Sequence, residues 1–331
     1  MIQALDHRAA RLEAWVRARL DCPVSWSVVS ADASSRRYFR AQARACSWIA
    51  VDSPPQSQNN QAFVDIAALF RGAGLNVPAV LACDLDAGFL LLSDLGDQRF
   101  IDVLDADNAD DLFAPAIAAL VDWQAASRPN VLPAYDRATL WREIRLFDQW
   151  YLPRVLGHVP GPEEQQALEA AYTFIIDRIV AQPSVFVHRD YMPRNLMMAA
   201  PLPGIIDFQD ARYGPASYDV ASLFRDAFIS WPEDRISTWM HAYWQAARAR
   251  HVPVADDWTT FVDDVALTGA QRHLKIMGLF VRLAEQQDKP AYAADLGRFA
   301  GYLAPVVHAH AALAPLRAPI DAAVARHAGP S

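Results

Sequence analysis

The sequence is poor in lysine and cysteine, and it has no long apolar run. Only Lys275 and Lys289 occur among 331 residues, so arginine carries nearly all the positive charge. The formal net charge is −8 and no Lys/Arg-rich segment occurs, which argues against a nucleic-acid partner. No apolar stretch reaches the roughly 18 residues that a membrane-spanning helix needs. We therefore expect no membrane association and a cytoplasmic location.

The three cysteines, Cys22, Cys46 and Cys83, are odd in number and widely separated. This spacing matches neither a disulfide framework nor a zinc site, and the histidines show no zinc-ligand spacing. We expect reduced thiols in the protein core and no zinc. The N-terminal segment contains Asp6 and Glu13 and lacks an uninterrupted apolar stretch, so it predicts an amphipathic helix rather than a signal peptide.

The first part of the chain combines short runs of β-forming residues with helical spacing. The runs predict strands at Val24–Val29, Arg37–Ala41, Ser47–Val51, Val80–Cys83 and Phe89–Leu92. Apolar residues at helical spacing predict a helix that contains Phe63, Ile66, Ala67 and Phe70. These elements predict a small antiparallel sheet that carries one helix.

After Gly96 the pattern changes to long helices with two short strand-like pieces. The predicted helices are Asn108–Ala126, Glu163–Val180, Tyr218–Phe228, Glu233–Arg250, Trp258–Gln286 and Ala291–Leu313, and the strand-like pieces are Val185–Val187 and Gly204–Ile206. The sequence therefore predicts an α+β chain. Residues 1–96 form a small N-terminal antiparallel β lobe with one helix, and residues 97–331 form a large, mainly helical C-terminal lobe.

One segment contains two motifs at a fixed separation. His188-Arg189-Asp190 is followed by Asn195, five residues after the aspartate, and by Asp207, seventeen residues after it. Phenylalanine follows Asp207. This is the spacing of the H-R-D-x-x-x-x-N catalytic loop and of the D-F metal-binding turn in kinase-like phosphotransferases.

Phosphoryl transfer explains the residue types in these motifs. The reaction needs a carboxylate that orients the attacking hydroxyl and accepts its proton, and Asp190 fits this role. Magnesium prefers hard oxygen ligands such as carboxylate and amide oxygens, which Asp207 and Asn195 supply. The alternative is that these residues only cap loops and turns. ATP and Mg²⁺ are the expected cofactors, and His188 and Arg189 are expected to brace the turn.

Strings along almost the whole chain resemble the aminoglycoside phosphotransferase and choline kinase superfamily. Within it, they resemble the anomeric N-acetylmuramate/N-acetylglucosamine kinases of bacterial peptidoglycan recycling. The matching strings are Asp32-Ala-Ser-Ser-Arg-Arg-Tyr-Phe-Arg40, Gly88-Phe-Leu-Leu-Leu-Ser-Asp-Leu-Gly96, residues 187–197, Asp207-Phe-Gln-Asp-Ala211, Asp226-Ala-Phe-Ile-Ser-Trp-Pro232 and Gln271-Arg-His-Leu-Lys275.

The resemblance implies a protein-kinase-like, two-lobed fold and an activity. The implied reaction is ATP-dependent phosphorylation of the anomeric hydroxyl of N-acetylmuramic acid and N-acetylglucosamine, which gives the sugar 1-phosphate in cell-wall recycling. We expect a monomer whose partner is a small-molecule amino sugar.

The resemblance also places the nucleotide. Ser93 and Leu95 would present backbone groups to the adenine edge at a hinge, and an ordinary strand end is the alternative. Ser34 and Ser35 lie where a phosphate-covering loop usually has glycines, and a plain hairpin turn is the alternative there.

The chain departs from the kinase pattern at the third predicted strand. Kinases place a lysine there and pair it with a helix glutamate, but Ser47–Asp52 has no lysine and the next helix offers only Asp65. Because both halves of this pair are missing, we hypothesise that Arg36 or Arg37 contacts the ATP phosphates. Solvated or structural arginines are the alternative.

The remaining site residues follow from the resemblance and from sugar chemistry. Asp219 fits the buried aspartate that hydrogen-bonds the catalytic-loop backbone in the superfamily. Gln209, Asp210, Tyr213 and Arg225 are the candidates for the acceptor pocket. An N-acetyl sugar needs hydroxyl and amide partners, and the lactyl carboxylate of muramic acid favours an arginine. Ordinary polar roles are the alternative for each.

The cluster of Arg272, His273 and Lys275 lies within a long helical pattern and predicts a solvated or lobe-bracing face. Two other functions stay open at this point. One is an aminoglycoside or other amino-alcohol phosphotransferase. The other is a pseudokinase that only binds nucleotide, which the missing lysine favours and the intact Asp190 and Asp207 oppose.

Overall fold

The computed structural model describes residues 2–30, 36–44, 46–286, 292 and 296–327. The chain divides into two compact units. Unit 1 comprises Met1–Leu104 with Arg194–Asp210, and unit 2 comprises Asp105–Pro193 with Ala211–Ser331. Each unit is therefore built from two separate stretches of sequence. The predicted lobes, 1–96 and 97–331, are continuous stretches, and their boundary stays a prediction.

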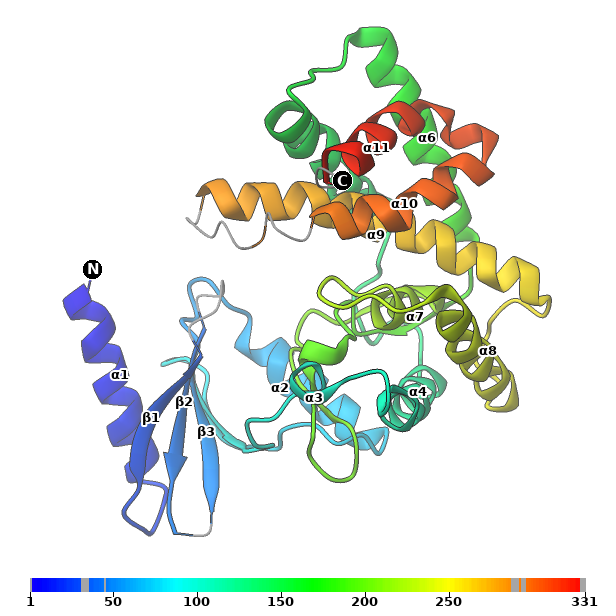
Figure 1. The fold of residues 1–331 in the computed structure, drawn as a ribbon. Helices are drawn as coiled ribbons and strands as arrows, with labels where there is room; N and C mark the ends of the chain where they lie inside the picture. Colours follow the sequence, from blue (N-terminus) through cyan, green and yellow to red (C-terminus); the bar gives the residue numbers. More distant parts are fainter. Residues whose placement is uncertain (1, 31–35, 45, 287–291, 293–295, 328–331) are drawn as a thin grey trace. The chain divides into compact units, whose positions relative to one another are not determined.

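Unit 1 is built on a five-stranded antiparallel sheet with the strand order β1-β2-β3-β5-β4, and Figure 1 labels its first three strands. The strands are β1 (Ser25–Ser30), β2 (Arg37–Gln42), β3 (Ser47–Asp52), β4 (Val80–Asp84) and β5 (Phe89–Ser93). Each predicted strand is present, with bounds that differ by at most one residue at either end. The helices of this unit are α1 (Ile2–Arg17), α2 (Asn60–Gly72) and α3 (Phe100–Val103).

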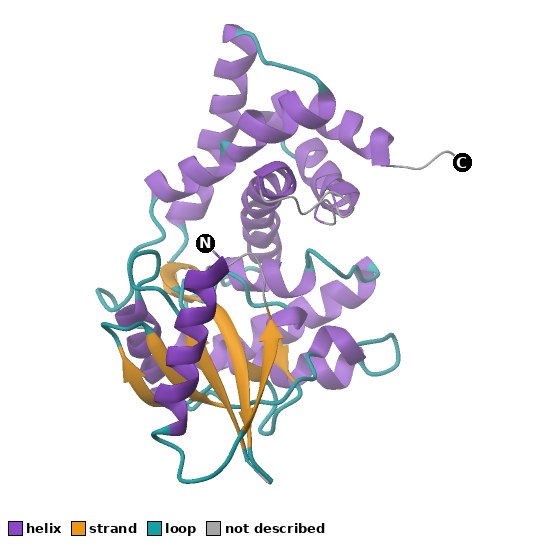
Figure 2. Ribbon diagram, turned by 90° about the vertical axis from the view of Figure 1, so that its left-hand side faces the viewer, coloured by secondary structure: helices purple, strands orange, loops and turns teal. Residues whose placement is uncertain are grey.

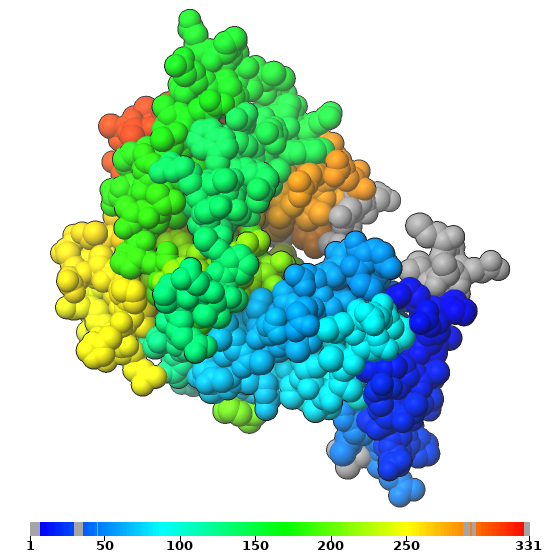
Figure 3. Space-filling model, turned by 180° about the vertical axis from the view of Figure 1, so that it is seen from behind, coloured from blue at the N-terminus to red at the C-terminus, as the bar shows by residue number. Residues whose placement is uncertain are grey.

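Helix α1 lies across one face of the sheet (Figure 2). Successive residues of a strand point to opposite faces, and the buried Phe39 and Ala50 point to the face that packs against Leu12 of α1. In Figure 3 the dark blue α1 borders the cyan β4–β5 hairpin, where Arg8 donates a hydrogen bond to the Ala87 carbonyl at 2.9 Å. This packing fixes the sheet face that α1 covers.

Unit 2 is mainly helical. Its helices are α4 (Ala109–Ala125), α5 (Arg137–Ile144), the π-helix η1 (Phe147–Leu156), α6 (Pro162–Ala181), α7 (Ser217–Phe224), α8 (Glu233–Ala249), α9 (Trp258–Gln286), α10 (Leu296–Ala309), η4 (Ala311–Leu313) and α11 (Ala314–His327). Strands β6 (Ser184–Val187) and β9 (Arg212–Pro215) pair antiparallel within it.

The predicted helical segments are largely present, with two corrections at their ends. The helix predicted over Tyr218–Phe228 ends at Phe224, because Arg225 leaves helical geometry with φ −115° and ψ 63°. The helix predicted over Ala291–Leu313 ends at Ala309 and is followed by the short η4, and its predicted start at Ala291 lies outside the described residues. The sequence analysis missed α5, η1 and α11, which are short or contain an internal proline.

Two expectations from composition can be compared with the structure. Cys46 and Cys83 are exposed and Cys22 is half-buried, so the prediction of core thiols is wrong. Cys83 is exposed because it lies on the edge strand β4, on the side away from α1 packing.

Among the described residues, no helix combines the length and the apolar character needed to cross a membrane.

Candidate active site

The backbone of the catalytic loop in unit 2 is held by Asp219. The loop follows β6, and the Asp219 carboxylate of α7 accepts hydrogen bonds from the backbone N–H groups of His188 at 2.7 Å and Arg189 at 2.9 Å. Asp219 is fully buried, and burial raises its pKa to about 6 against the opposing effect of His188. Arg189 has φ 79°, a left-handed conformation that a non-glycine residue adopts only where its surroundings enforce it.

Asp190 extends from this loop with a side chain that is 44% exposed. Burial works against its ionisation, but the positive charges of Lys275, Arg272 and Arg189 outweigh it and lower the pKa of Asp190 below its usual value. Its own N–H contacts Nδ1 of His188 at 3.3 Å. Asp190 is therefore an ionised, partly accessible carboxylate in a positively charged setting, which suits the orientation of a hydroxyl donor.

Glu143 of α5 connects the residues around this loop. It accepts a hydrogen bond from Arg189 Nη2 at 2.5 Å and lies 3.4 Å from Lys275 Nζ. The Tyr135 hydroxyl also bonds to Glu143. Burial opposes ionisation of Glu143, but Lys275 and Arg189 hold its pKa below the usual value. Sequence reasoning missed Glu143 and Tyr135, because neither belongs to a motif.

Arg272 and His273 of α9 are both buried, each 1% exposed. Of the expected solvated or lobe-bracing face, the solvated alternative is therefore wrong for these two residues. They lie on the side of α9 that packs within unit 2, where Arg272 Nη2 is 4.0 Å from Asp190 Oδ1. His273 contacts the Arg225 carbonyl at 3.2 Å. In the structure both lie among the buried residues of α9.

The two predicted metal ligands lie together in unit 1. Strands β7 (Leu196–Met197) and β8 (Gly204–Ile205) form a hairpin between them. The N–H of Ile206 donates to the Asn195 carbonyl at 3.1 Å, so the segments that carry Asn195 and Asp207 run side by side. Asp207 has φ 64°, and its Oδ1 accepts a hydrogen bond from Gln209 Nε2 at 2.9 Å.

Phe208 anchors the Asp207 turn to helix α2. Its ring is 1% exposed and lies 5.1 Å from the Phe63 ring and 5.3 Å from the Phe70 ring, measured between centroids. Aromatic pairs at this separation are favourable beyond the area that they bury. The apolar ring therefore fixes the turn while Asp207 itself stays exposed.

The donor set of this turn suits magnesium. Asp207 offers a carboxylate and Asn195 a carboxamide, and magnesium in phosphate sites uses one or two such ligands together with water and phosphate oxygens. Within the described part of the chain, no group of three or more His, Cys, Asp or Glu side chains is placed so that it could hold a metal ion. Such a group is typical of sites in which the protein alone surrounds the ion, and this turn is not of that kind.

The hinge candidates lie at the end of β5. The Ser93 hydroxyl accepts the N–H of Ala79 at 2.8 Å. Asp94 forms an ion pair with Arg40 at 2.6 Å, and although burial opposes it, Arg40 lowers the pKa of Asp94. Leu95 lies beside Gly204, where an added Cβ would meet the Leu95 side chain at 3.0 Å. These contacts fix the strand end at which the adenine is expected.

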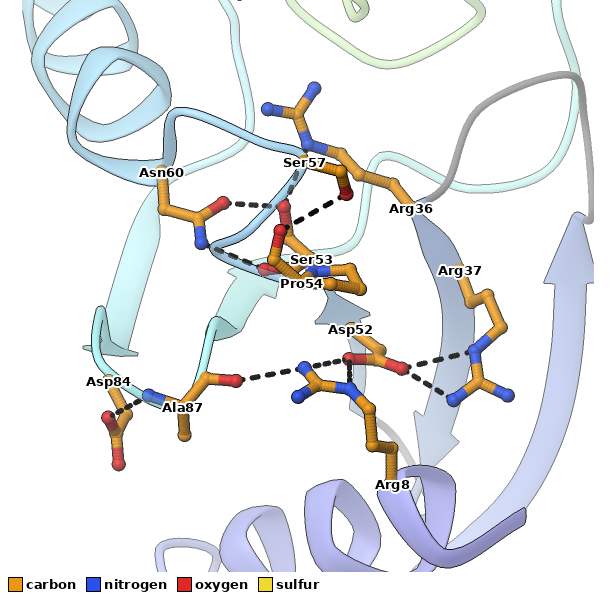
Figure 4. Close-up of polar contacts among 10 residues, drawn as sticks. All are labelled: Arg8, Arg36, Arg37, Asp52, Ser53, Pro54, Ser57, Asn60, Asp84 and Ala87. Carbon is orange, nitrogen blue, oxygen red and sulfur yellow. Dashed lines mark hydrogen bonds and ion pairs between the residues drawn. The ribbon is translucent and has the colours of Figure 1, made fainter. Parts of the chain in front are cut away.

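Asp52 occupies the end of β3 and binds two arginines (Figure 4). It is 1% exposed, and its carboxylate lies 2.5 Å from Nη2 of Arg8 on one oxygen and 2.5 Å from Nη2 of Arg37 on the other. Arg8 belongs to α1, so this cluster lies on the sheet face that α1 covers. Arg37 is thus part of a clamp between α1, β2 and β3.

Arg36 points to the other side of the strand, toward α2 (Figure 4). Its Nε donates to the Ser53 hydroxyl at 3.1 Å, and its guanidinium lies 5.6 Å from the centroid of the Phe63 ring. Ser53 also bonds to Asn60 at 2.5 Å. The two arginines therefore have separate surroundings. Ser34 and Ser35 lie outside the described residues.

The acceptor candidates fall into both units. Gln209 and Asp210 belong to unit 1, where Gln209 binds Asp207 and Asp210 is exposed. Tyr213 and Arg225 belong to unit 2. The Tyr213 ring packs against Phe186 at 6.2 Å. Arg225 pairs with Glu233 through bonds of 2.6 and 3.1 Å.

Comparison with known proteins gives concordant matches. The sequence model of the phosphotransferase enzyme family matches residues 25–258. A Pseudomonas putida protein named N-acetylmuramate/N-acetylglucosamine kinase is 46% identical over 292 residues, which cover 88% of this chain and 86% of that protein. A Neisseria meningitidis protein of the same name is 40% identical, over 87% of each chain.

Solved structures share the fold at low sequence identity. A choline kinase from Streptococcus pneumoniae superposes with a TM-score of 0.64 at 14% identity, over 90% of this chain and 99% of that one. An ADP-bound aminoglycoside phosphotransferase superposes with a TM-score of 0.59 at 13% identity, over 88% of this chain and 96% of that one. The predicted α+β, protein-kinase-like fold is confirmed.

Proposed function

The chain belongs to the phosphotransferase enzyme family and is a small-molecule kinase, and from this we propose its substrates and its product. The enzyme transfers the γ-phosphoryl group of ATP to the anomeric hydroxyl of N-acetylmuramic acid and N-acetylglucosamine. The product is the sugar 1-phosphate, and the role of the reaction is cell-wall recycling. The names of the Pseudomonas putida and Neisseria meningitidis relatives support the choice of sugars.

The observation that carries the proposal is the position and the charge of the Asp190 carboxylate. Its carboxylate is ionised, 44% exposed and fixed on a loop whose two preceding amides bind Asp219. In phosphoryl transfer the protein contributes mainly position and charge. Asp190 orients the acceptor hydroxyl toward the γ-phosphorus and takes its proton as the new P–O bond forms and the bond to ADP breaks.

Asn195 and Asp207 would hold magnesium. Magnesium, when bound, neutralises charge that develops on the phosphate oxygens. The β7–β8 hairpin keeps the two backbone segments that carry these residues side by side, and the packing of Phe208 on α2 fixes the turn at Asp207, which supports this role. The similar aminoglycoside phosphotransferase structure was solved with ADP bound, which supports ATP as the phosphoryl donor.

The experiment is an acceptor panel with the purified full-length protein. ADP release is measured with N-acetylmuramic acid, N-acetylglucosamine, kanamycin and choline at equal concentrations. Turnover with the two amino sugars only is the expected result. Turnover with kanamycin or choline alone overturns the choice of acceptor, and no release with any acceptor favours a nucleotide-binding module without catalysis.

The position of the phosphate is tested on the product. Phosphorylation at the anomeric carbon removes the reducing end, so a reducing-sugar assay loses its signal as ADP accumulates. Phosphorylation at any other hydroxyl leaves the reducing end intact. The role in recycling is tested in the bacterial host, where loss of the gene is expected to make free N-acetylmuramic acid accumulate.

A further inference from the structure

A buried arginine lies beside the catalytic carboxylate without binding it tightly. Arg272, in the middle of α9, is 1% exposed, and its Nη2 lies 4.0 Å from Asp190 Oδ1 and 3.8 Å from the Met192 sulfur. Within the described residues, its Nε and Nη1 atoms have no hydrogen-bond partner. A buried guanidinium with unmet donors is costly, so its presence there needs a reason.

Other arginines of unit 2 form direct hydrogen bonds to carboxylates, as is usual for a structural ion pair. Arg225 makes two hydrogen bonds to Glu233, at 2.6 and 3.1 Å. Arg145 bonds to Asp148 at 2.9 Å and to Glu169 at 3.0 Å. Direct pairing of this kind occupies the carboxylate oxygens. A separation of 4.0 Å exceeds hydrogen-bond distance, so Arg272 acts on Asp190 by charge and leaves the lone pairs of Oδ1 unused by this contact.

A second buried carboxylate responds to Arg272. Asp226, in the turn after α7, is fully buried, and its Oδ1 accepts the N–H of Phe228 at 2.5 Å. Its Oδ2 has no partner in the part of the chain that the structure describes. Burial raises the pKa of Asp226 to about 6, and the positive charge of Arg272 acts against that rise. Arg272 is therefore coupled electrostatically to two carboxylates.

We propose that Arg272 is a positioning residue for phosphoryl transfer, which keeps Asp190 ionised with its oxygens directed to the acceptor hydroxyl, while Asp226 provides a buried counter-charge. The proposal rests on the proposed function, because it concerns the same reaction. Asp226 and Arg272 come from two segments that lie far apart in the sequence, 226–232 and 271–275. Both belong to the strings that flank the kinase motifs rather than to the motifs themselves.

Several other charged side chains among the described residues act on Asp190, and they stay in place in the test. Lys275 lies on α9, one turn from Arg272. His188 and Arg189 belong to the loop of Asp190 itself, and Asp219 of α7 contributes a negative charge. Removal of Arg272 takes away one of several positive charges, so a partial rise in the pKa of Asp190 is expected.

The test compares Arg272→Met with wild type through kcat, both KM values and the pH profile of kcat. N-acetylglucosamine is the acceptor, since it has no carboxylate of its own. We expect kcat to fall about 100-fold with the KM for ATP within about twofold of wild type. The acid limb of the profile should move up by about one pH unit. A kcat that falls while the acid limb stays in place assigns Arg272 a purely structural role and overturns the proposal, as does a wild-type kcat.

Two further variants keep the proposal testable if Arg272→Met does not fold. Arg272→Lys retains the charge, so its acid limb should stay at the wild-type position, and an upward shift contradicts the proposal. Asp226→Asn replaces a carboxyl group that is protonated below about pH 6, above the range where Asp190 titrates, so its acid limb should stay at the wild-type position, and a shift in either direction contradicts the proposal. The matched control is Arg178→Met, which removes an arginine that pairs with Asp263 of α9 at 2.8 Å and should leave the profile unaltered.

The wild-type protein separates this proposal from the proposed function. If wild type phosphorylates neither amino sugar, the proposed acceptors are wrong, and the same profiles are measured with whichever acceptor of the panel is turned over. If the wild-type protein is active and Arg272→Met has the same kcat and the same pH profile, only the inference about Arg272 is wrong.

Discussion

Asp219 binds the N–H of Arg189 at 2.9 Å, at the residue where the catalytic loop has left-handed backbone geometry, φ 79°. The same carboxylate binds the N–H of His188. A buried amide that loses its acceptor costs about 1–3 kcal/mol, and Asp219 serves two of them. The side chain therefore fixes the direction in which Asp190 leaves the loop.

The first prediction follows from this pair of bonds. Asp219→Ala should lower the free energy of unfolding by about 2–4 kcal/mol. It should also lower kcat, with a smaller relative change in the KM for ATP. Urea denaturation at pH 7 and steady-state kinetics measure the two effects. Asp177→Ala is the control, because Asp177 is 56% exposed and pairs with the surface residue Arg137. Equal kcat values for both variants would show that the loop does not depend on Asp219.

The second prediction concerns pH and uses Asp226. Its folded pKa, about 6, lies above the usual 3.8. The folded state thus binds this proton more tightly than the unfolded state does. The stability from Asp226 is fully present below pH 3.8 and is lost as the pH rises through 6. A shift of this size corresponds to about 3 kcal/mol.

Asp226→Asn removes this titration and retains an oxygen that can accept the N–H of Phe228. Between pH 4 and pH 7, the unfolding free energy of the variant relative to wild type should rise by up to about 3 kcal/mol. Urea denaturation of both proteins across that range measures it. A constant difference between the two curves would mean that Asp226 titrates normally in the folded protein.

The third prediction separates the roles of Asp190 and Asp207. Asp190→Ala should reduce kcat by about 10²–10⁴-fold without changing the magnesium concentration for half-maximal activity. Asp207→Ala should also abolish turnover, and the magnesium-dependent rise in melting temperature with ATP should disappear. Asp65→Asn is the control, since this exposed aspartate of α2 accepts a hydrogen bond from Gln61 on the same helix. Near-wild-type rates in either alanine variant contradict the assignment.

Local sequence patterns were sufficient for the strands of unit 1, because each of β1–β5 coincides with a short run of β-forming residues. The motif spacing also placed Asp190 on a loop after a strand and Asp207 at a turn. Long-range contacts could not be read in this way. Glu143 and Arg272 reach the catalytic loop from α5 and α9, and no local pattern links such distant segments. The pairing of Asp52 with Arg8 likewise depends on how α1 packs on the sheet.

The two arginines that could replace the missing lysine lie on opposite sides of β2. The usual lysine pairs with a helix glutamate, so the phosphates are expected on the sheet face toward α2. Arg37 points to the other face, where Asp52 binds it together with Arg8. Arg36 points toward α2 and contacts Ser53 and the Phe63 ring. The phosphate contact is thus predicted to belong to Arg36.

The fourth prediction tests this division of roles. Arg36→Ala should raise the KM for ATP by about tenfold, the effect of one lost charge-assisted hydrogen bond. Arg37→Ala should leave that KM unchanged and instead lower the free energy of unfolding, because it strips one partner from a buried carboxylate. Arg8→Ala is the matched control for Arg37, since both side chains are 24% exposed and bind the same Asp52. A larger KM effect in Arg37→Ala than in Arg36→Ala would place the phosphates on the α1 side of the sheet, where α1 already covers the strands.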